Sequence, residues 1–150
     1  MNTLIEIQDL QISFRNQESW KTIIKNSSFS LYENEILGIV GESGSGKSVT
    51  SLALMGLLPN EISRIDQGKI IFQGKDLTQI DETSFRKMKG KEISMIFQEP
   101  MTSLNPVFTC GEQVSEAIIA HQHLNKEEAK AQTITLFKEV QLPRPENIYD

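Results

Sequence analysis

Residues 36–49 decide the fold of this protein, and their sequence is Ile36-Leu37-Gly38-Ile39-Val40-Gly41-Glu42-Ser43-Gly44-Ser45-Gly46-Lys47-Ser48-Val49. Gly41 to Ser48 match the phosphate-binding loop pattern G-x-x-x-x-G-K-S. The apolar run 36–40 before the loop is typical of a fully buried parallel strand. The mostly apolar residues 48–58 after it predict a helix, which Pro59 would end. Strand, loop and helix therefore follow one another in the order that nucleotide binding requires.

The residue types in this loop suit the phosphate groups of a nucleotide. Gly44 and Gly46 have no Cβ, so the main chain can adopt positive φ angles and bring its N–H groups close to the phosphates. A helix that starts near Gly46 adds unpaired N–H groups and the positive end of its dipole. Lys47 would supply a positive charge to the β- and γ-phosphates, and the Ser48 hydroxyl would ligate Mg²⁺. The predicted nucleotide-binding residues are Gly41, Glu42, Ser43, Gly44, Ser45, Gly46, Lys47, Ser48 and Val49.

Composition and charge narrow the class of protein. With 150 residues, of which 38% are hydrophobic and 23% charged, the chain is ordinary for a globular domain. The net charge of -5 argues against nucleic acid as the main partner. The single cysteine, Cys110, excludes an internal disulfide and suits a reducing compartment. No apolar run approaches the ~18–20 residues of a membrane span, and no signal-peptide pattern is present, so we expect a soluble cytoplasmic protein.

The residues before the loop predict antiparallel strands. Apolar and polar residues alternate over 10–14 and again over 28–31, which predicts two strands with one apolar face each. Residues 15–21 between them are mostly polar and predict a loop. A further strand is expected over 68–76, between two glycines, at the edge of the same sheet.

An aromatic side chain near the phosphate loop could stack on a purine base, and Phe14 and Trp20 are the candidates. Alternatively, Phe14 belongs to the core, on the same face as Leu10 and Ile12, and Trp20 is an isolated aromatic residue in a loop. Periodicity leaves this choice open.

Residues 93–97 form a second, largely apolar run and predict another parallel strand. The run is followed by Gln98, Glu99 and Pro100, and Pro100 favours an extended exit. Because ligands of open α/β sheets sit at the carboxyl ends of the strands, Gln98 is expected at the same edge as Gly41. Its amide could ligate Mg²⁺ or orient a water molecule.

The remainder of the chain predicts helices. Thr109 and Glu112 form a capping-box pattern in front of a helix over 113–120. Asn125 and Glu128 form a second such pattern, and apolar residues at helical spacing follow it.

Two stretches of the sequence resemble the ATP-binding subunits of ABC transporters. The order of phosphate loop, apolar strand ending at Gln98 and helical insertion is similar to that family. Residues 38–49, GIVGESGSGKSV, and 95–107, MIFQEPMTSLNPV, resemble the branch that imports oligopeptides, dipeptides and nickel. The second stretch is more specific, since many NTPases share the phosphate loop. The resemblance covers the chain from about Leu4 to Leu142.

The resemblance implies an α/β fold. Its core is of the P-loop NTPase (RecA-like) type, with an N-terminal antiparallel β subdomain and the start of a helical subdomain. The expected parts of this incomplete nucleotide-binding domain, 1–150, are the antiparallel β part over 1–35 and 67–79, the P-loop core over 36–58 and 92–99, and the helical subdomain over 107–143.

The same resemblance implies roles for particular residues. Gly41 to Ser48 would be the Walker A loop. Gln98 would be the Q-loop glutamine, which reaches Mg²⁺ and the attacking water and couples them to the membrane subunit, so that Ser48 and Gln98 are the expected metal ligands. Phe14 matches the position of the aromatic residue that stacks on adenine, with Trp20 as the second candidate. The implied cofactors are ATP and Mg²⁺.

The implied function is that of the ATP-binding subunit of an importer for peptides or related solutes such as nickel, which couples ATP binding and hydrolysis to transport. Residues 112–140 would belong to the helical subdomain that docks on the transmembrane permease subunits. A second ATP-binding subunit, identical or related, would complete the pair, and a solute-binding protein would take part indirectly. The expected location is the cytoplasmic side of the inner membrane, as a peripheral protein.

The resemblance breaks off before several motifs of the family. The signature motif Leu-Ser-Gly-Gly-Gln is expected just after Asp150, and the Walker B carboxylates and the switch histidine are also missing from the sequence. We therefore expect the first part of an ATPase, from a gene fragment or a shortened chain, with an exposed sheet edge, an unfilled core and no hydrolysis by the chain alone. The alternatives are a non-catalytic nucleotide-binding remnant and a different P-loop enzyme such as a small-molecule kinase, which would leave 95–107 unexplained.

Overall fold

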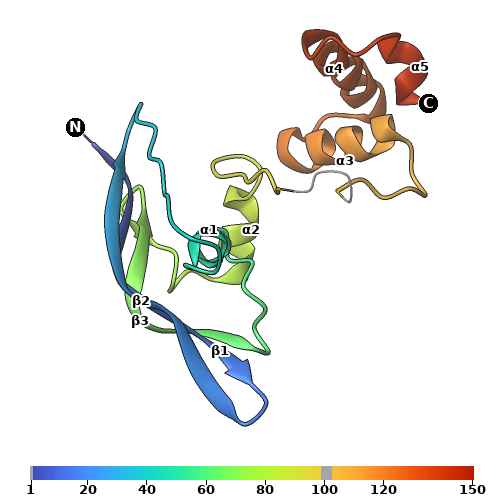
Figure 1. Ribbon diagram of the computed structural model, residues 1–150. Helices are drawn as coiled ribbons and strands as arrows, with labels where there is room; N and C mark the ends of the chain where they lie inside the picture. The colour runs from blue at the N-terminus through green and yellow to red at the C-terminus, as the bar shows by residue number, and fades with distance from the viewer. Residues whose placement is uncertain (1, 99–102) are drawn as a thin grey trace. The chain divides into compact units, whose positions relative to one another are not determined.

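The computed structural model describes residues 2–98 and 103–150, which form two compact units, Met1–Arg86 and Lys87–Asp150. The first unit holds an antiparallel sheet and helix α1, and the second holds helices α3, α4 and α5 (Figure 1). The elements are β1 Thr3–Asn16, β2 Ser19–Tyr32, α1 Lys47–Leu54, β3 Ser63–Phe72, β4 Lys75–Asp76, α2 Glu82–Met88, α3 Cys110–Gln122, α4 Lys126–Glu139 and α5 Pro145–Tyr149. None of the described helices is long and apolar enough to cross a membrane.

The sheet of the first unit confirms the predicted N-terminal antiparallel strands. Its order is β2-β1-β3-β4, and β1 pairs antiparallel with both β2 and β3. The prediction of a loop over 15–21 is wrong, because β1 continues to Asn16 and β2 begins at Ser19. A tight hairpin turn with Gln17 at φ 49 replaces that loop.

A bulge in β1 keeps apolar side chains on the buried face of the sheet both before and after it. Ile7 and Leu10 are three residues apart, whereas their partners in β2 are two apart, so β1 contains one extra residue. Asp9 is that residue: it has φ 45, and its N–H donates to the Ser28 hydroxyl at 2.8 Å. The inward face therefore changes from odd to even positions, and Ile7, Leu10 and Ile12 are all fully buried.

The predicted strand over 68–76 is two strands joined by a tight turn. Gly68 lies inside β3 at φ 91, where an added Cβ would be 2.4 Å from the carbonyl oxygen of Gln8. Gln73 and Gly74, at φ 48 and 79, then reverse the chain into β4. Two consecutive positive φ angles are typical of the turn that joins closely paired strands.

Helix α1 packs on one face of this sheet (Figure 1). A groove of about 130 Å³ between them is lined on the sheet side by residues such as Phe29 and on the helix side by residues such as Leu54. The helix ends at Leu54, earlier than the predicted range 48–58. Gly56 then takes φ 58, with the Phe85 ring lying where its Cβ would be.

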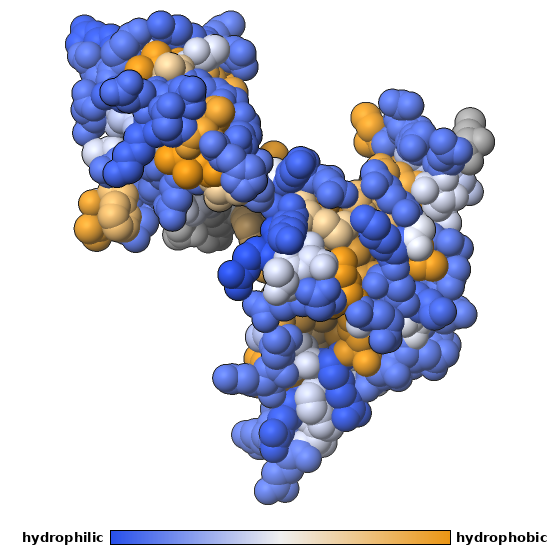
Figure 2. Space-filling view, turned by 180° about the vertical axis from the view of Figure 1, so that it is seen from behind, coloured by the Kyte–Doolittle hydropathy of each residue, from blue (hydrophilic) through white to orange (hydrophobic). Residues whose placement is uncertain are grey.

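Neither of the two predicted parallel strands forms among the described residues. Residues 36–40 are in no strand, and Ile36 and Val40 are 98% and 94% exposed. Residues 93–97 contain one isolated parallel bridge and no strand, and Ile96 is 93% exposed. A buried parallel strand needs neighbours that pair with its main chain and cover both of its faces, and no described segment provides them here. Because neither run is a strand among the described residues, the expected exposed sheet edge does not form there; instead the apolar side chains of these runs are exposed, and Figure 2 shows apolar side chains at the surface.

The second unit begins its two long helices at the predicted capping boxes. At α3 the Thr109 hydroxyl accepts from the Glu112 N–H at 3.2 Å, and the Glu112 carboxylate accepts from the Thr109 N–H at 3.1 Å. At α4 Asn125 and Glu128 exchange the same pair of bonds, both at 3.0 Å. Each box satisfies N–H groups that a helix start would otherwise leave without partners.

A hydroxyl cluster joins the three helices of the second unit. The Ser115 hydroxyl lies 2.9 Å from the Thr133 hydroxyl and 3.1 Å from the Tyr149 hydroxyl. Thr133 also donates to the Ala129 carbonyl at 2.8 Å. Because Ser115 and Thr133 are buried, these bonds satisfy polar groups that water does not reach.

Candidate functional site

The start of α1 has the main-chain conformation that the glycines of the loop predict. Gly44 and Gly46 have φ 81 and 94, and Gly46 is the N-cap residue of the helix. No side chain caps the helix start, and its first turn contains no acidic residue. The first N–H groups of α1 are therefore left without a protein acceptor in the part of the chain that the structure describes.

The start of α1 differs from the other described helix starts in the charge of its first turn. Each of the other described helices has at least one carboxylate in its first turn, as α2 has Glu82 and α5 has Glu146. The first turn of α1 instead begins with Lys47. The N–H groups, the positive end of the helix dipole and the ammonium group thus add up to a local positive potential that favours an anion.

Lys47 also closes the loop on itself. Its Nζ donates to the carbonyl oxygens of Gly41 and Glu42, both at 2.8 Å, and to the Ser45 hydroxyl at 3.2 Å. An added Cβ at Gly41 would lie 2.7 Å from the Ser45 Oγ, so the loop is too tight there for a side chain that leaves Ser45 in place. These contacts draw the loop into a ring around the ammonium group.

Thr50 anchors the other end of the loop, although the phosphate-loop pattern does not single it out. Its N–H and its hydroxyl both donate to the Gly46 carbonyl, at 2.9 and 3.1 Å. The side chain is buried, at 7% exposure. Its sequence signal is its spacing, because a threonine four residues after the N-cap can bond back to the N-cap carbonyl.

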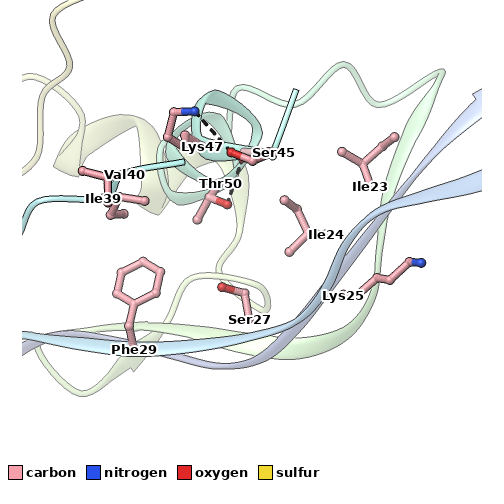
Figure 3. A pocket seen from close by; sticks show the side chains of 11 residues that line it. Ile23, Ile24, Lys25, Ser27, Phe29, Ile39, Val40, Ser45, Lys47 and Thr50 are labelled. Atoms are coloured by element: carbon pink, nitrogen blue, oxygen red, sulfur yellow. Dashed lines mark hydrogen bonds between the residues drawn. The ribbon is translucent and has the colours of Figure 1, made fainter. Parts of the chain in front are cut away.

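A pocket of about 310 Å³ lies between the phosphate loop and β2 (Figure 3). Ser45, Gly46, Lys47 and Thr50 form one wall. The other walls come from β2 and from the irregular segment before the loop, and they are Ile23, Ile24, Lys25, Ser27, Phe29, Ile39 and Val40. The pocket therefore combines the ammonium groups of Lys25 and Lys47 with a lining of mixed apolar and polar side chains.

Neither candidate for base stacking lines this pocket. Phe14 is half-buried in β1, paired with Lys21 of β2 and Ser63 of β3. Trp20 is in β2, not in a loop, and the Arg64 guanidinium lies 4.2 Å from the centre of its ring. The alternative of an isolated loop aromatic at Trp20 is wrong, whereas the stacking of Phe14 on adenine stays a prediction.

The two predicted metal ligands lie in different units. Ser48 is the second residue of α1 and is exposed, whereas Gln98 is exposed and belongs to the second unit. The predicted exit at Glu99 and Pro100 lies outside the described residues. Within the described ranges, no group of three or more His, Cys, Asp and Glu side chains could hold a metal ion. The donors at the start of α1 fit a polyphosphate, and a metal ion would bind there together with it.

Comparison with known proteins finds relatives that match nearly the whole chain. The sequence profile of the ABC transporter family matches residues 24–148. The oligopeptide transport ATP-binding protein OppD of Bacillus subtilis is 46% identical over 143 residues, which are 95% of this chain and 40% of OppD. The dipeptide transport ATP-binding protein DppD of Escherichia coli is 42% identical over 147 residues, which are 98% of this chain and 45% of DppD. The chain thus spans less than half the length of these relatives.

A solved structure agrees on the fold. The ABC transporter cassette MJ0796, solved as a dimer, superposes with a TM-score of 0.76 and 24% sequence identity. The match covers 94% of this chain and 59% of the cassette. The match shows that the chain has part of the cassette fold, with its antiparallel β part and its helices.

Proposed function

Because this chain belongs to the ABC transporter family, we propose that it is part of the ATP-binding subunit of an importer for peptides or related solutes such as nickel. The observation that carries the proposal is the uncapped, positively charged start of α1 inside a complete phosphate-loop pattern. The similarity to proteins named for oligopeptide and dipeptide transport supports the solute class.

In this proposal the bound molecule is Mg-ATP. The loop residues 41–49 surround the phosphates, Lys47 pairs with the β- and γ-phosphates, and the Ser48 hydroxyl ligates Mg²⁺. Lys47 would exchange its bonds to loop carbonyls for bonds to phosphate oxygens, which are charged acceptors and therefore stronger. Gln98 is the proposed second metal ligand and water-orienting group, and Phe14 the proposed partner of the adenine ring.

The proposed partners follow from the same assignment. The helical part around α3 and α4 would dock on transmembrane permease subunits at the cytoplasmic side of the inner membrane. A second ATP-binding subunit, identical or related, would complete the active pair, and a solute-binding protein would act indirectly. The dimeric arrangement of the MJ0796 cassette supports the pairing.

Hydrolysis is proposed for the complete subunit and not for these 150 residues alone. Phosphoryl transfer to water needs Mg²⁺ held from two sides, a polarised water and charge stabilisation around the γ-phosphate. This sequence offers Lys47, Ser48 and Gln98 but no Walker B carboxylates, signature motif or switch histidine. We expect the 150-residue chain to bind Mg-ATP weakly and to turn it over no faster than its Lys47→Ala variant.

Two measurements on the chain test these proposals. Titration with a fluorescent ATP analogue should saturate, be reversed by unlabelled ATP and weaken when Mg²⁺ is chelated. A phosphate-release assay should give equal rates for the chain and for Lys47→Ala. Absence of saturable binding would overturn the assignment of the site, and steady turnover that Lys47→Ala abolishes would favour an independent P-loop enzyme.

A further inference from the structure

Ile24 of β2 touches the phosphate loop at Gly46. An added Cβ at Gly46 would lie 2.2 Å from the Ile24 Cδ1, so the isoleucine methyl group occupies the space beside the Gly46 Cα. The next nearest atoms are the Ile24 Cγ1 at 3.6 Å and the Ile23 carbonyl oxygen at 3.9 Å. Ile24 itself is only 5% exposed.

The pairing of β2 is irregular on both sides of Ile24. Ile24 pairs with Ile12 of β1, and the register shifts between this pair and each neighbouring pair. On both sides β2 contains one residue more than β1. Such bulges bend a strand and redirect its side chains, so the direction of Ile24 differs from what a regular strand would give.

Gly46 is thus held from two sides. Ile24 packs against the Gly46 Cα, and Thr50 donates two hydrogen bonds to the Gly46 carbonyl oxygen. The left-handed conformation of Gly46, at φ 94, sets the direction in which the first N–H groups of α1 point. Whatever restrains Gly46 therefore also orders the groups that face a phosphate.

We propose that Ile24 is a positioning residue for the nucleotide. Its Cδ1 methyl group holds Gly46 in the left-handed conformation and so fixes the N–H groups of the helix start before the phosphates arrive. A site that is already ordered binds more tightly, because less conformational freedom is lost on binding. This inference rests on the proposed function, since it concerns the same phosphate loop.

The substitution Ile24→Val tests the inference, because it removes the one methyl group that reaches Gly46. We expect the dissociation constant for Mg-ATP to rise about three- to tenfold, the loss expected when a few groups must be ordered on binding. Ile70→Val is the matched control. Ile70 lies in β3 of the same sheet at 1% exposure, and it lines neither the pocket nor the groove beside α1.

Both variants lose one buried methyl group and should lose similar thermal stability. Only Ile24→Val should weaken Mg-ATP binding and speed amide hydrogen exchange at Lys47, Ser48 and Val49. If Ile24→Val binds as tightly as the wild type, or if Ile70→Val weakens binding equally, the inference is overturned while the proposed function stands. If the wild-type chain does not bind Mg-ATP, the proposed function fails, and the inference fails with it.

A double-mutant cycle tests the contact itself. Gly46→Ala places a Cβ against the Ile24 Cδ1, whereas in Ile24→Val the nearest remaining side-chain atom would be a Cγ at an ordinary 3.6 Å. Gly46→Ala should therefore lower the melting temperature less in the Ile24→Val background than in the wild type. Strain from the positive φ angle is common to both backgrounds and cancels in the cycle. Equal effects in the two backgrounds would contradict the contact.

Discussion

The starts of α1 and of α4 differ in whether side chains accept hydrogen bonds from their unpaired N–H groups. Both helices begin with a lysine, and both have first-turn N–H groups that the helix cannot satisfy. At α4, the side-chain oxygens of Asn125 and Glu128 accept from two of the N–H groups at the helix start, those of Glu128 and of Asn125, both at 3.0 Å. At α1, Gly46 offers no side chain, and no carboxylate lies in the first turn.

The difference shows which helix start is kept for a ligand. A capping box stabilises its helix at all times and leaves few N–H groups for an anion. A bare glycine start gives up that stability, and the loop is ordered instead by Lys47, by Thr50 and by packing against β2. The phosphate-loop sequence thus leaves the start of α1 without a side-chain cap, and this uncapped start is suited to bind an anion.

The largest predicted effect is on the affinity for Mg-ATP, and it compares the lysines that begin α1 and α4. Lys47→Ala removes the ammonium group from the loop and should weaken Mg-ATP binding by about 1.5–3 kcal/mol, the value of a charged hydrogen bond. Lys126→Ala removes the corresponding exposed lysine at the start of α4 and should leave the affinity unchanged. Calorimetric titration of both variants measures the difference. Equal affinities for the two variants would mean that the nucleotide is held elsewhere.

The second prediction asks whether the sheet adds to the binding by the helix start. If Phe14 stacks on adenine, Phe14→Ala should weaken ATP and ADP alike by ~1–3 kcal/mol. Trp20→Ala serves as the control, since the Trp20 ring already faces the Arg64 guanidinium. Competition against a fluorescent ATP analogue gives both affinities. Loss of binding in Trp20→Ala with a silent Phe14→Ala would reverse the two assignments.

The third prediction concerns the loss of the side-chain cap at the start of α3. Thr109→Ala deletes the hydroxyl that accepts from the Glu112 N–H and should destabilise the chain by about 1 kcal/mol. The affinity for Mg-ATP should not change, because the start of α3 is not part of the proposed nucleotide site and keeps the Glu112 carboxylate in its first turn. Urea unfolding and nucleotide titration of one sample separate the two effects. A weaker affinity at unchanged stability would show that α3 takes part in binding.

The smallest predicted effect concerns the cap of α2. The Asp81 carboxylate precedes this helix and accepts from the Ser84 N–H at 2.9 Å. Hydrogen bonds from Ser84, first from its hydroxyl and then from its main chain, lower the pKa of Asp81 from its ordinary value of 3.8. Because the pKa is lower in the folded state, ionised Asp81 stabilises the fold above the unfolded pKa, and this contribution is lost as the pH falls through the folded pKa.

Asp81→Asn therefore makes stability less dependent on pH below 3.8. At neutral pH the variant should match the wild type, since asparagine caps a helix about as well as aspartate. Acid unfolding followed by circular dichroism compares the two chains. Identical acid limbs would show that Asp81 contributes nothing through its charge.

Features set by neighbouring residues were predictable from the sequence. The capping boxes at Thr109 and Asn125 and the positive φ angles of Gly44 and Gly46 involve residues close in the chain, and all are present. Asn34 likewise has φ 61, a region that asparagine adopts more readily than most residues. Such features need no distant partner, so a short pattern is sufficient to identify them.

Features that depend on distant residues were not predictable. The apolar run 36–40 has the composition of a strand but lacks described neighbours, whereas β1 has neighbours on both sides and extends over 14 residues. The contact of Ile24 with Gly46 joins residues that no sequence pattern links. For the site, the loop and its lysine follow from the phosphate-loop pattern, whereas the bonds of Lys47 to its own loop do not. The back-bond of Thr50 is outside that pattern as well, and only the spacing of Thr50 from the N-cap residue indicates it.

The most direct test of the central claim is the response of individual main-chain amides to Mg-ATP. In a ¹H–¹⁵N spectrum of the chain, the amide signals of residues 44–49 should shift on titration with Mg-ATP. Those at the capped starts of α3 and α4, around Glu112 and Glu128, should stay in place. Shifts confined to the helical unit, or no shift at the start of α1 while ATP binds, would contradict the account.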